Sequence, residues 1–225
     1  MATLAVSGSV THRYRAERGV VHLSLGFEGD DREAVVADSV ALHGRVSREA
    51  TAFRRQGAAT WWSAQSVTVG LVAEPVAVDG AGASSSRRDR PVRHRTRSTV
   101  EVRFQDFAAL SEWVTDLALV DGVSIDWIEW SLSHDRRAEA ERSARIAAVA
   151  DAVARAADYA EALGLRTPTL AAVFEPGLRP GAPGGGMPFG AARSMMAKGG
   201  GGDDGFDLAP DDIEVHAEIS ADFVA

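Results

Sequence analysis

The chain has 225 residues, 45% of them hydrophobic, which is enough for one large domain or two small ones with a buried core. It has no cysteine, which excludes disulfides, a thiolate nucleophile and a cysteine-ligated zinc site. Its net charge of −8 argues against a generic nucleic-acid binder. No apolar run approaches the roughly 20 residues of a membrane helix, and the N-terminus has no signal-like leader. We therefore expect a soluble, cytoplasmic protein.

Strand and helix patterns open the chain. Residues 4–8 indicate a short first strand, and the alternation over 21–28 indicates a second, half-buried one. Asp30, with Glu33 three residues later, predicts the start of a helix by a capping box, and Gly57 predicts its end. Helical spacing gives the expected buried face of this helix as Val36, Ser39, Leu42, Val46, Ala50 and Phe53.

The next part of the chain indicates a long β-hairpin. Residues 61–72 form one expected strand, and residues 96–104 alternate as the other. Residues 78–90, between them, are rich in Gly, Ser and Arg, so we expect a mobile hairpin tip. The expected inner face of the second strand is Thr96, Ser98, Val100, Val102 and Phe104. The expected outer face is Arg95, Arg97, Thr99, Glu101 and Arg103.

A short helix and a strand follow the hairpin. Asp106 is expected to cap a helix over 107–117, and the strand is expected over 123–132. Trp127 and Trp130 have opposite parity in that strand, so we expect one in the core and the other exposed. An exposed tryptophan would be available as an interface anchor.

Residues 135–164 predict a long helix. Alanine, the best helix former, dominates it. Glu141 precedes Arg145 by four residues, the favourable order for an ion pair, and Gly164 predicts the end of the helix. Its small side chains suggest that it lies close to a sheet. The expected apolar stripe is Ile146, Val149, Val153, Ala156, Ala160 and Leu163.

The C-terminal part of the chain contains two expected strands, at 170–175 and 213–223. Between them, residues 177–206 are rich in Gly, Pro and Met, and we expect a flexible loop. Two charged stripes could meet as cross-strand ion pairs if their strands pair within a chain or across subunits. The competing interpretation, two independent solvated faces, is slightly favoured. The stripes are Arg93, Arg95 and Arg97 in one strand, and Glu214, His216 and Glu218 in the other.

The order of these elements resembles the SIMPL-domain family, named after a signalling molecule associated with a mouse pelle-like kinase. The resemblance is carried by the strand at 123–132, the alanine-rich helix, Leu163-Gly164 and the strand that ends at Glu175. It implies a single SIMPL-like domain over 1–225. We expect an α+β fold: a twisted, mainly antiparallel sheet with about three helices packed on it. Bacterial relatives include periplasmic and outer-membrane-associated antigens, and many relatives are exported.

The resemblance implies a non-enzymatic protein that self-associates as a scaffold or binding module, since some relatives build closed, ring-like assemblies. We expect a homo-oligomer, with any further protein partner unknown. One alternative is a small-molecule-binding or hydrolytic domain with a site between sheet and helices. Another is nucleic-acid contact through the arginine-rich hairpin tip, which ranks lower because no aromatic residues interleave the arginines. These arginines are Arg87, Arg88, Arg90, Arg93, Arg95 and Arg97.

We expect no catalytic residue, no cofactor and no metal site. The glycines at 199–202 follow Lys198 but lack the Gly-Lys-Ser/Thr of a phosphate loop. Ser7 and Ser194 do not lie in a nucleophile elbow. The histidines show no metal-ligand spacing; they are His12, His22, His43, His94, His134 and His216.

Overall fold

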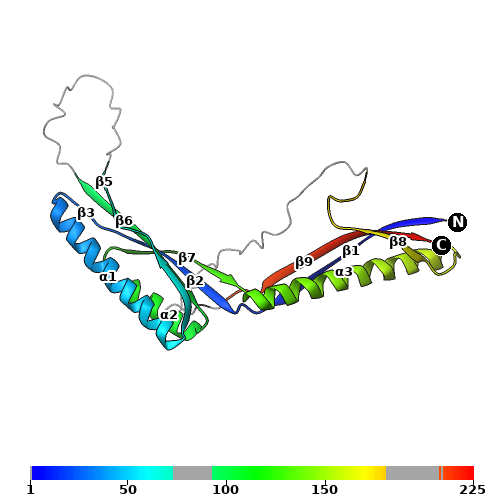
Figure 1. The fold of residues 1–225 in the computed structure, drawn as a ribbon, viewed down its shortest axis with the longest axis horizontal. Coiled ribbons are helices and arrows are strands. Elements are labelled where there is room, and N and C mark those ends of the chain that lie inside the picture. The colour runs from blue at the N-terminus through cyan, green and yellow to red at the C-terminus, as the bar shows by residue number, and fades with distance from the viewer. Residues whose placement is uncertain (1, 73–92, 181–207, 209) are drawn as a thin grey trace, which may run out of the picture. The chain divides into compact units, whose positions relative to one another are not determined.

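The computed structural model describes residues 2–72, 93–180, 208 and 210–225, and the chain forms two compact units (Figure 1). The terminal unit consists of Met1–Glu17, Ser131–Met195 and Pro210–Ala225, and the central unit of Arg18–Trp130 and Met196–Ala209. Each unit contains its own sheet with helix packed on it, so the predicted α+β class is confirmed. The single domain over 1–225 stays a prediction.

The terminal unit is built on a three-stranded antiparallel sheet with the order β1-β9-β8. Its strands are β1 (Thr3–Tyr14), β8 (Thr169–Phe174) and β9 (Ile213–Val224). β1 and β9 pair over their whole length, from Thr3↔Val224 to Tyr14↔Ile213. The prediction of a short first strand is therefore wrong: β1 has twelve residues, because β9 supplies a partner along all of it.

Helix α3 (His134–Ala162) lies on one face of this sheet, and all of its buried residues are alanines. Its buried residues follow each other every four positions: Ala140, Ala144, Ala148, Ala152, Ala156 and Ala160. Of the predicted apolar stripe, Ala156 and Ala160 are buried and Val149 is half-buried, but Ile146, Val153 and Leu163 are 59%, 46% and 65% exposed, so the prediction is wrong for these three.

The reason for the alanine face is the close approach of α3 to β1. A Cβ atom added at Gly8 would lie 2.1 Å from the carbonyl oxygen of Ala148 and 2.8 Å from the Cβ of Ala152. At this separation a larger aliphatic side chain on the inner face would clash with the strand. Steric fit, more than side-chain hydrophobicity, decides which residues of α3 face the sheet.

The central unit is organised around β6 (His94–Phe104), which pairs with strands on both of its edges. Residues 98–104 pair with β2 (Arg18–Leu25) and β4 (Ala59–Ala64). Residues 94–97 pair with β3 (Glu28–Gly29) and β5 (Thr68–Leu71). β7 (Val123–Ser131) lies beside β2. The strand predicted at 61–72 is thus two strands, and the tip predicted at 78–90 lies outside the described residues.

Helices α1 (Arg32–Gln56) and α2 (Phe107–Leu117) pack on this sheet. The predicted start of α1 is wrong by one residue, because Asp31 is the residue whose side chain accepts the N–H groups of Glu33 and Ala34. The C-cap is Gly57, as predicted, with a left-handed φ of 79°. Val35 takes the buried place predicted for Val36. The cap of α2 at Asp106 is confirmed.

The core of the central unit lies between β6 and the helices. Val100, Val102 and Phe104 are fully buried, as the alternation in the sequence predicts. Phe104, Phe53 and Trp113 form a cluster in which the ring centroids lie 5.2–5.6 Å apart. The indole N–H of Trp113 donates to Glu49 at 2.9 Å. Within 2–72 and 93–180, where the described helices lie, no helix is both long and apolar enough to cross a membrane.

Candidate functional surfaces

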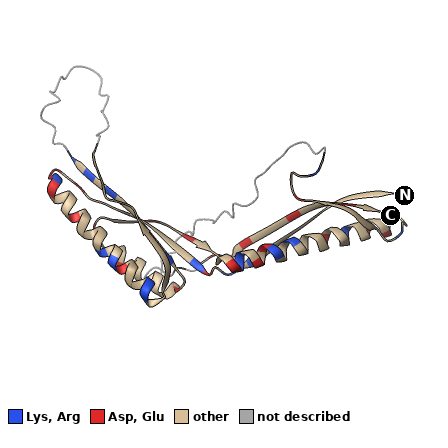
Figure 2. Cartoon of the chain, in the orientation of Figure 1, with Lys and Arg blue, Asp and Glu red and all other residues tan. Residues whose placement is uncertain are grey.

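The central sheet has an open face, opposite the face covered by α1 and α2. Alternate residues of β2 and β6 project from it, and Figure 2 shows the basic positions along β6. The pairs His22↔Glu101 and Ser24↔Thr99 place polar side chains from neighbouring strands next to each other on this face. The open face is therefore lined by polar side chains of neighbouring strands.

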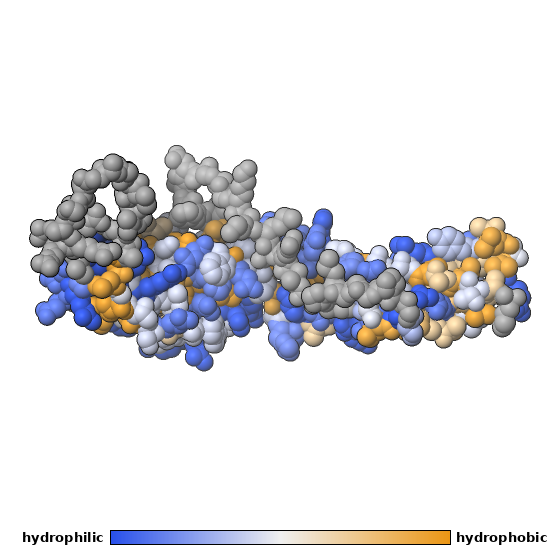
Figure 3. Space-filling model, turned by 90° about the horizontal axis from the view of Figure 1, so that it is seen from above, coloured by the Kyte–Doolittle hydropathy of each residue, from blue (hydrophilic) through white to orange (hydrophobic). Residues whose placement is uncertain are grey.

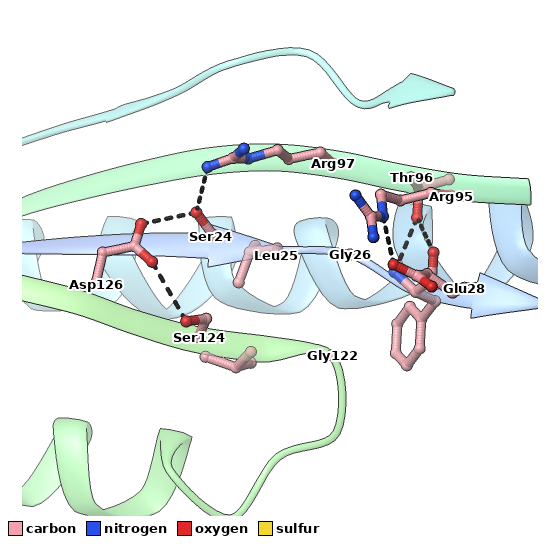
Figure 4. A pocket seen from close by; sticks show the side chains of 12 residues that line it. Ser24, Leu25, Gly26, Glu28, Arg95, Thr96, Arg97, Gly122, Ser124 and Asp126 are labelled. Carbon is pink, nitrogen blue, oxygen red and sulfur yellow. Dashed lines mark hydrogen bonds and ion pairs between the residues drawn. The ribbon is translucent and has the colours of Figure 1, made fainter. Parts of the chain in front are cut away.

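A pocket of about 590 Å³ lies on the open face where β2 gives way to β3 (Figure 4). Two glycines shape it. A Cβ at Gly26 would lie 2.1 Å from the carbonyl oxygen of Thr96, and a Cβ at Gly122, whose φ is 81°, would lie 2.5 Å from the ring of Phe27. The N–H of Gly26 donates to the carbonyl of Gly122 at 2.8 Å, which ties the pocket's two walls together.

A chain of hydrogen bonds runs across the pocket (Figure 4). The hydroxyl of Ser24 donates to Asp126 Oδ2 at 2.7 Å and accepts from Arg97 Nη2 at 3.4 Å. Ser124 donates to the other carboxylate oxygen of Asp126 at 3.3 Å. Arg95, also in the pocket, is paired with Glu28. Among the residues that the structure describes, Arg97 has no carboxylate partner and Asp126 no cationic one.

Sequence reasoning did not single out Ser24 or Asp126. The signal that could have found Asp126 is an aspartate in the middle of a strand, because strands are depleted in Asp. The hydroxyl of Ser24 is committed to Asp126, and no imidazole bonds to it within the described part of the chain. Ser24 therefore lacks the base that activates a serine nucleophile.

His22 and Trp127 form a second feature of the open face. Their rings stack with centroids 4.3 Å apart, and the two ring nitrogens of His22 lie 3.5 Å from Glu101 and 3.7 Å from Glu129. Trp127 is 52% exposed, whereas Trp130 is 6% exposed and packs against Phe107. The prediction that one tryptophan of this strand enters the core and the other stays exposed is confirmed.

The arginine stripe of β6 is largely neutralised within the unit. Arg93 lies 3.8 Å from Asp30, and Arg95 pairs with Glu28. Arg87, Arg88 and Arg90 lie outside the described residues. These pairs reduce the positive charge that this stripe could offer to nucleic acid.

The strands that carry the two charged stripes do not pair with each other within one chain, so the stripes do not meet there as cross-strand ion pairs. β6 and β9 belong to different sheets, and β9 pairs with β1 and β8. Glu214 instead accepts from Arg13 of β1 at 2.9 Å, and His216 Nδ1 lies 3.1 Å from Thr11 Oγ1. Contact between the stripes of two subunits stays a prediction.

The terminal unit exposes apolar side chains that α3 leaves uncovered. Leu170 and Val173 of β8 are 45% and 42% exposed, and Ile146 and Val153 of α3 are 59% and 46% exposed. Figure 3 shows hydrophobic residues gathered at the end of this unit that carries both chain termini. β8 has the sequence Thr-Leu-Ala-Ala-Val-Phe, without a charge. It is an edge strand that bonds only to β9 in the described ranges.

The opposite edge of the same sheet is covered. The N–H of Ser9, in β1, donates to Asp151 Oδ2 of α3 at 3.0 Å. This bond holds the pKa of Asp151 below its usual value, and a hydrogen bond from Arg155 acts in the same direction. A charged side chain that caps an edge N–H is a barrier to pairing with another strand. The terminal sheet therefore has one guarded edge and one uncharged edge.

The family model SIMPL, described as a protein of unknown function (DUF541), matches residues 4–223. No curated protein matches the chain.

Proposed function

The chain belongs to the SIMPL family, and we propose that it is a non-enzymatic scaffold or binding module that self-associates through its terminal unit. The single observation that carries the proposal is the uncharged edge of β8. An edge strand with β-forming side chains, no charge and no proline is a template for pairing with another strand. β8 has no charge and no proline over Thr169–Phe174, and Thr169, Val173 and Phe174 are β-forming residues.

Two exposed apolar side chains of β8 favour a second copy of the chain as the partner of this edge. Leu170 and Val173 pair with the buried Phe223 and Ala221, so they point to the side of the sheet that α3 covers. They remain exposed because α3 lies over β1 and β9 and leaves the outer strand uncovered. Pairing two β8 strands would place these side chains against those of the partner.

The flank of α3 toward β8 is apolar as well. Asp151 marks the flank over the β1 edge, because it bonds to Ser9. Val149 and Val153 are two positions from Asp151, about half a helical turn, so they lie on the other flank. Leu170, Val173 and these valines thus share one side of the sheet. An antiparallel β8–β8 pair about a twofold axis would bury all four side chains in both copies.

Light scattering on Val173→Lys tests the proposal. We expect the full chain to show a mass above that of the 23.8 kDa monomer, and Val173→Lys to weaken association at least tenfold, because a charge at the edge opposes pairing. Val40→Lys, at an exposed position of α1 in the central unit, is the matched control and should associate like the unmodified chain. A monomeric wild type at micromolar concentration, or an unchanged Val173→Lys, contradicts the proposal.

A further inference from the structure

We propose that the pocket on the open face of the central sheet binds a free α-amino acid, with Arg97 holding its carboxylate and Asp126 its ammonium group. The pocket volume of about 590 Å³ lies within the range of small-molecule sites, which is roughly 300–1,000 Å³. Its polar side chains stand on strands β2, β6 and β7, so they are held in place before a ligand arrives.

The charges of the pocket select a zwitterion. Arg95 is neutralised by Glu28, which leaves Arg97 and Asp126 as its charged groups without an opposite partner in the described chain. Arg97 has five N–H donors and gives one of them to Ser24 in a long 3.4 Å bond. An anion bound at Arg97 would be repelled by Asp126, and a cation bound at Asp126 would be repelled by Arg97. A ligand with both charges satisfies both groups.

The spacing of the two groups fits charges carried on one α-carbon. Only the hydroxyl of Ser24 separates Arg97 from Asp126, so the guanidinium and the carboxylate are two hydrogen bonds apart (Figure 4). The ammonium and carboxylate of an α-amino acid are similarly close, whereas the two ends of a longer peptide are not. Arg97 can hold the ligand carboxylate with two parallel N–H bonds.

The remaining lining decides which amino acid fits. Phe27 and Val123 contribute apolar surface beside the polar groups. Apolar surface favours an aliphatic side chain, because burying it removes hydrocarbon from water. We therefore take L-leucine as the probe.

Titration calorimetry with the full chain tests this site. We expect L-leucine to bind with a dissociation constant of about 10 μM to 1 mM, as suits a small ligand in an open pocket. N-acetyl-leucine lacks the ammonium charge and leucinamide lacks the carboxylate, so each should bind at least tenfold more weakly. Absence of binding by L-leucine, or equal binding of the three compounds, overturns the proposal.

Variants assign the two roles. Arg97→Gln and Asp126→Asn should each weaken L-leucine binding at least tenfold while the circular dichroism spectrum stays that of the unmodified chain. The matched control is Arg103→Gln: Arg103 stands on the same face of β6, outside the pocket, and lies over Trp61 at 5.3 Å. Unchanged affinity in Arg97→Gln, or an equal loss in Arg103→Gln, overturns the assignment.

Discussion

Helix α1 of the central unit and helix α3 of the terminal unit both cover an antiparallel sheet, but they bury different side chains. α1 buries Val35, Leu42 and Val46 and contributes Phe53 to an aromatic cluster. The buried residues of α3 are all alanines, and Ile146 and Val153 point outward. The close approach at Gly8 leaves no room for more. A helix that packs closely on a sheet can therefore keep its large apolar side chains exposed.

The largest effect should come from adding a methyl group at the close approach in the terminal unit. Gly8→Ala places a Cβ 2.1 Å from the backbone of α3, so the helix must move. We expect a loss of about 2–3 kcal/mol in the free energy of unfolding, measured by urea denaturation. Gly44→Ala in α1 is the control, because its Cβ would meet only the end of Arg48 at 3.4 Å. Gly44→Ala should raise the free energy of unfolding by up to about 1 kcal/mol. Similar losses of stability at both glycines would contradict the close approach of α3 to β1.

Truncating a large side chain should affect the two helices differently. Leu42→Ala removes a buried side chain from the core of the central unit, and we expect a loss of about 2–4 kcal/mol. Ile146→Ala removes a side chain that is 59% exposed, so stability should change by less than about 0.5 kcal/mol. Chemical denaturation at a concentration where the chain is monomeric measures both. A loss above 2 kcal/mol at Ile146 would mean that α3 buries its aliphatic face.

The guarded edge of β1 should make stability depend on pH. Since the folded pKa of Asp151 is lowered by the N–H of Ser9, its contribution is complete above the unfolded pKa and is lost as pH falls through the folded one. Unfolding measured between pH 6 and pH 2 should therefore show a shallower loss in Asp151→Asn than in the unmodified chain. Asp158→Asn, which removes an exposed carboxylate from the same helix, is the control. Equal slopes in all three proteins would contradict the bond to Ser9.

The smallest effect concerns the charged stripes. A double-mutant cycle on Arg13→Ala and Glu214→Ala should give a coupling energy of about 0.2–1 kcal/mol, since this exposed pair bridges β1 and β9 at 2.9 Å. The cycle on Arg95→Ala and Glu218→Ala should be additive in the monomer, because their strands belong to different sheets. Coupling in the second cycle that appears only in the oligomer would support contact between the stripes of two subunits.

Much of the fold follows from local patterns in the sequence. Alternation located the inner face of β6, and single cap residues located Asp106 and Gly57 at the helix ends. These features depend on neighbours along the chain, so a sequence carries them directly. The pairing of β1 with β9 depends on residues about 200 positions apart, and no local pattern shows it.

The candidate sites were harder to predict, for two physical reasons. On α3, hydrophobicity favoured Ile146 and Val153 as the buried face, but the tight fit against Gly8 admits only alanine. In the pocket, Arg97 and Asp126 come from strands that meet only through β2. Among the described residues, neither forms an ion pair, and this is a property of the folded sheet that has no counterpart along the chain.

Cysteine cross-linking at β8 tests self-association through the uncharged edge most directly. The chain has no cysteine, so Ala171→Cys introduces one thiol, in the middle of β8. If two β8 strands pair about a twofold axis that passes near Ala171, these thiols lie near the distance that a disulfide requires. Mild oxidation should then convert Ala171→Cys to a covalent dimer at least tenfold faster than Val40→Cys, an exposed position of α1. Equal, slow cross-linking of both variants would contradict the account.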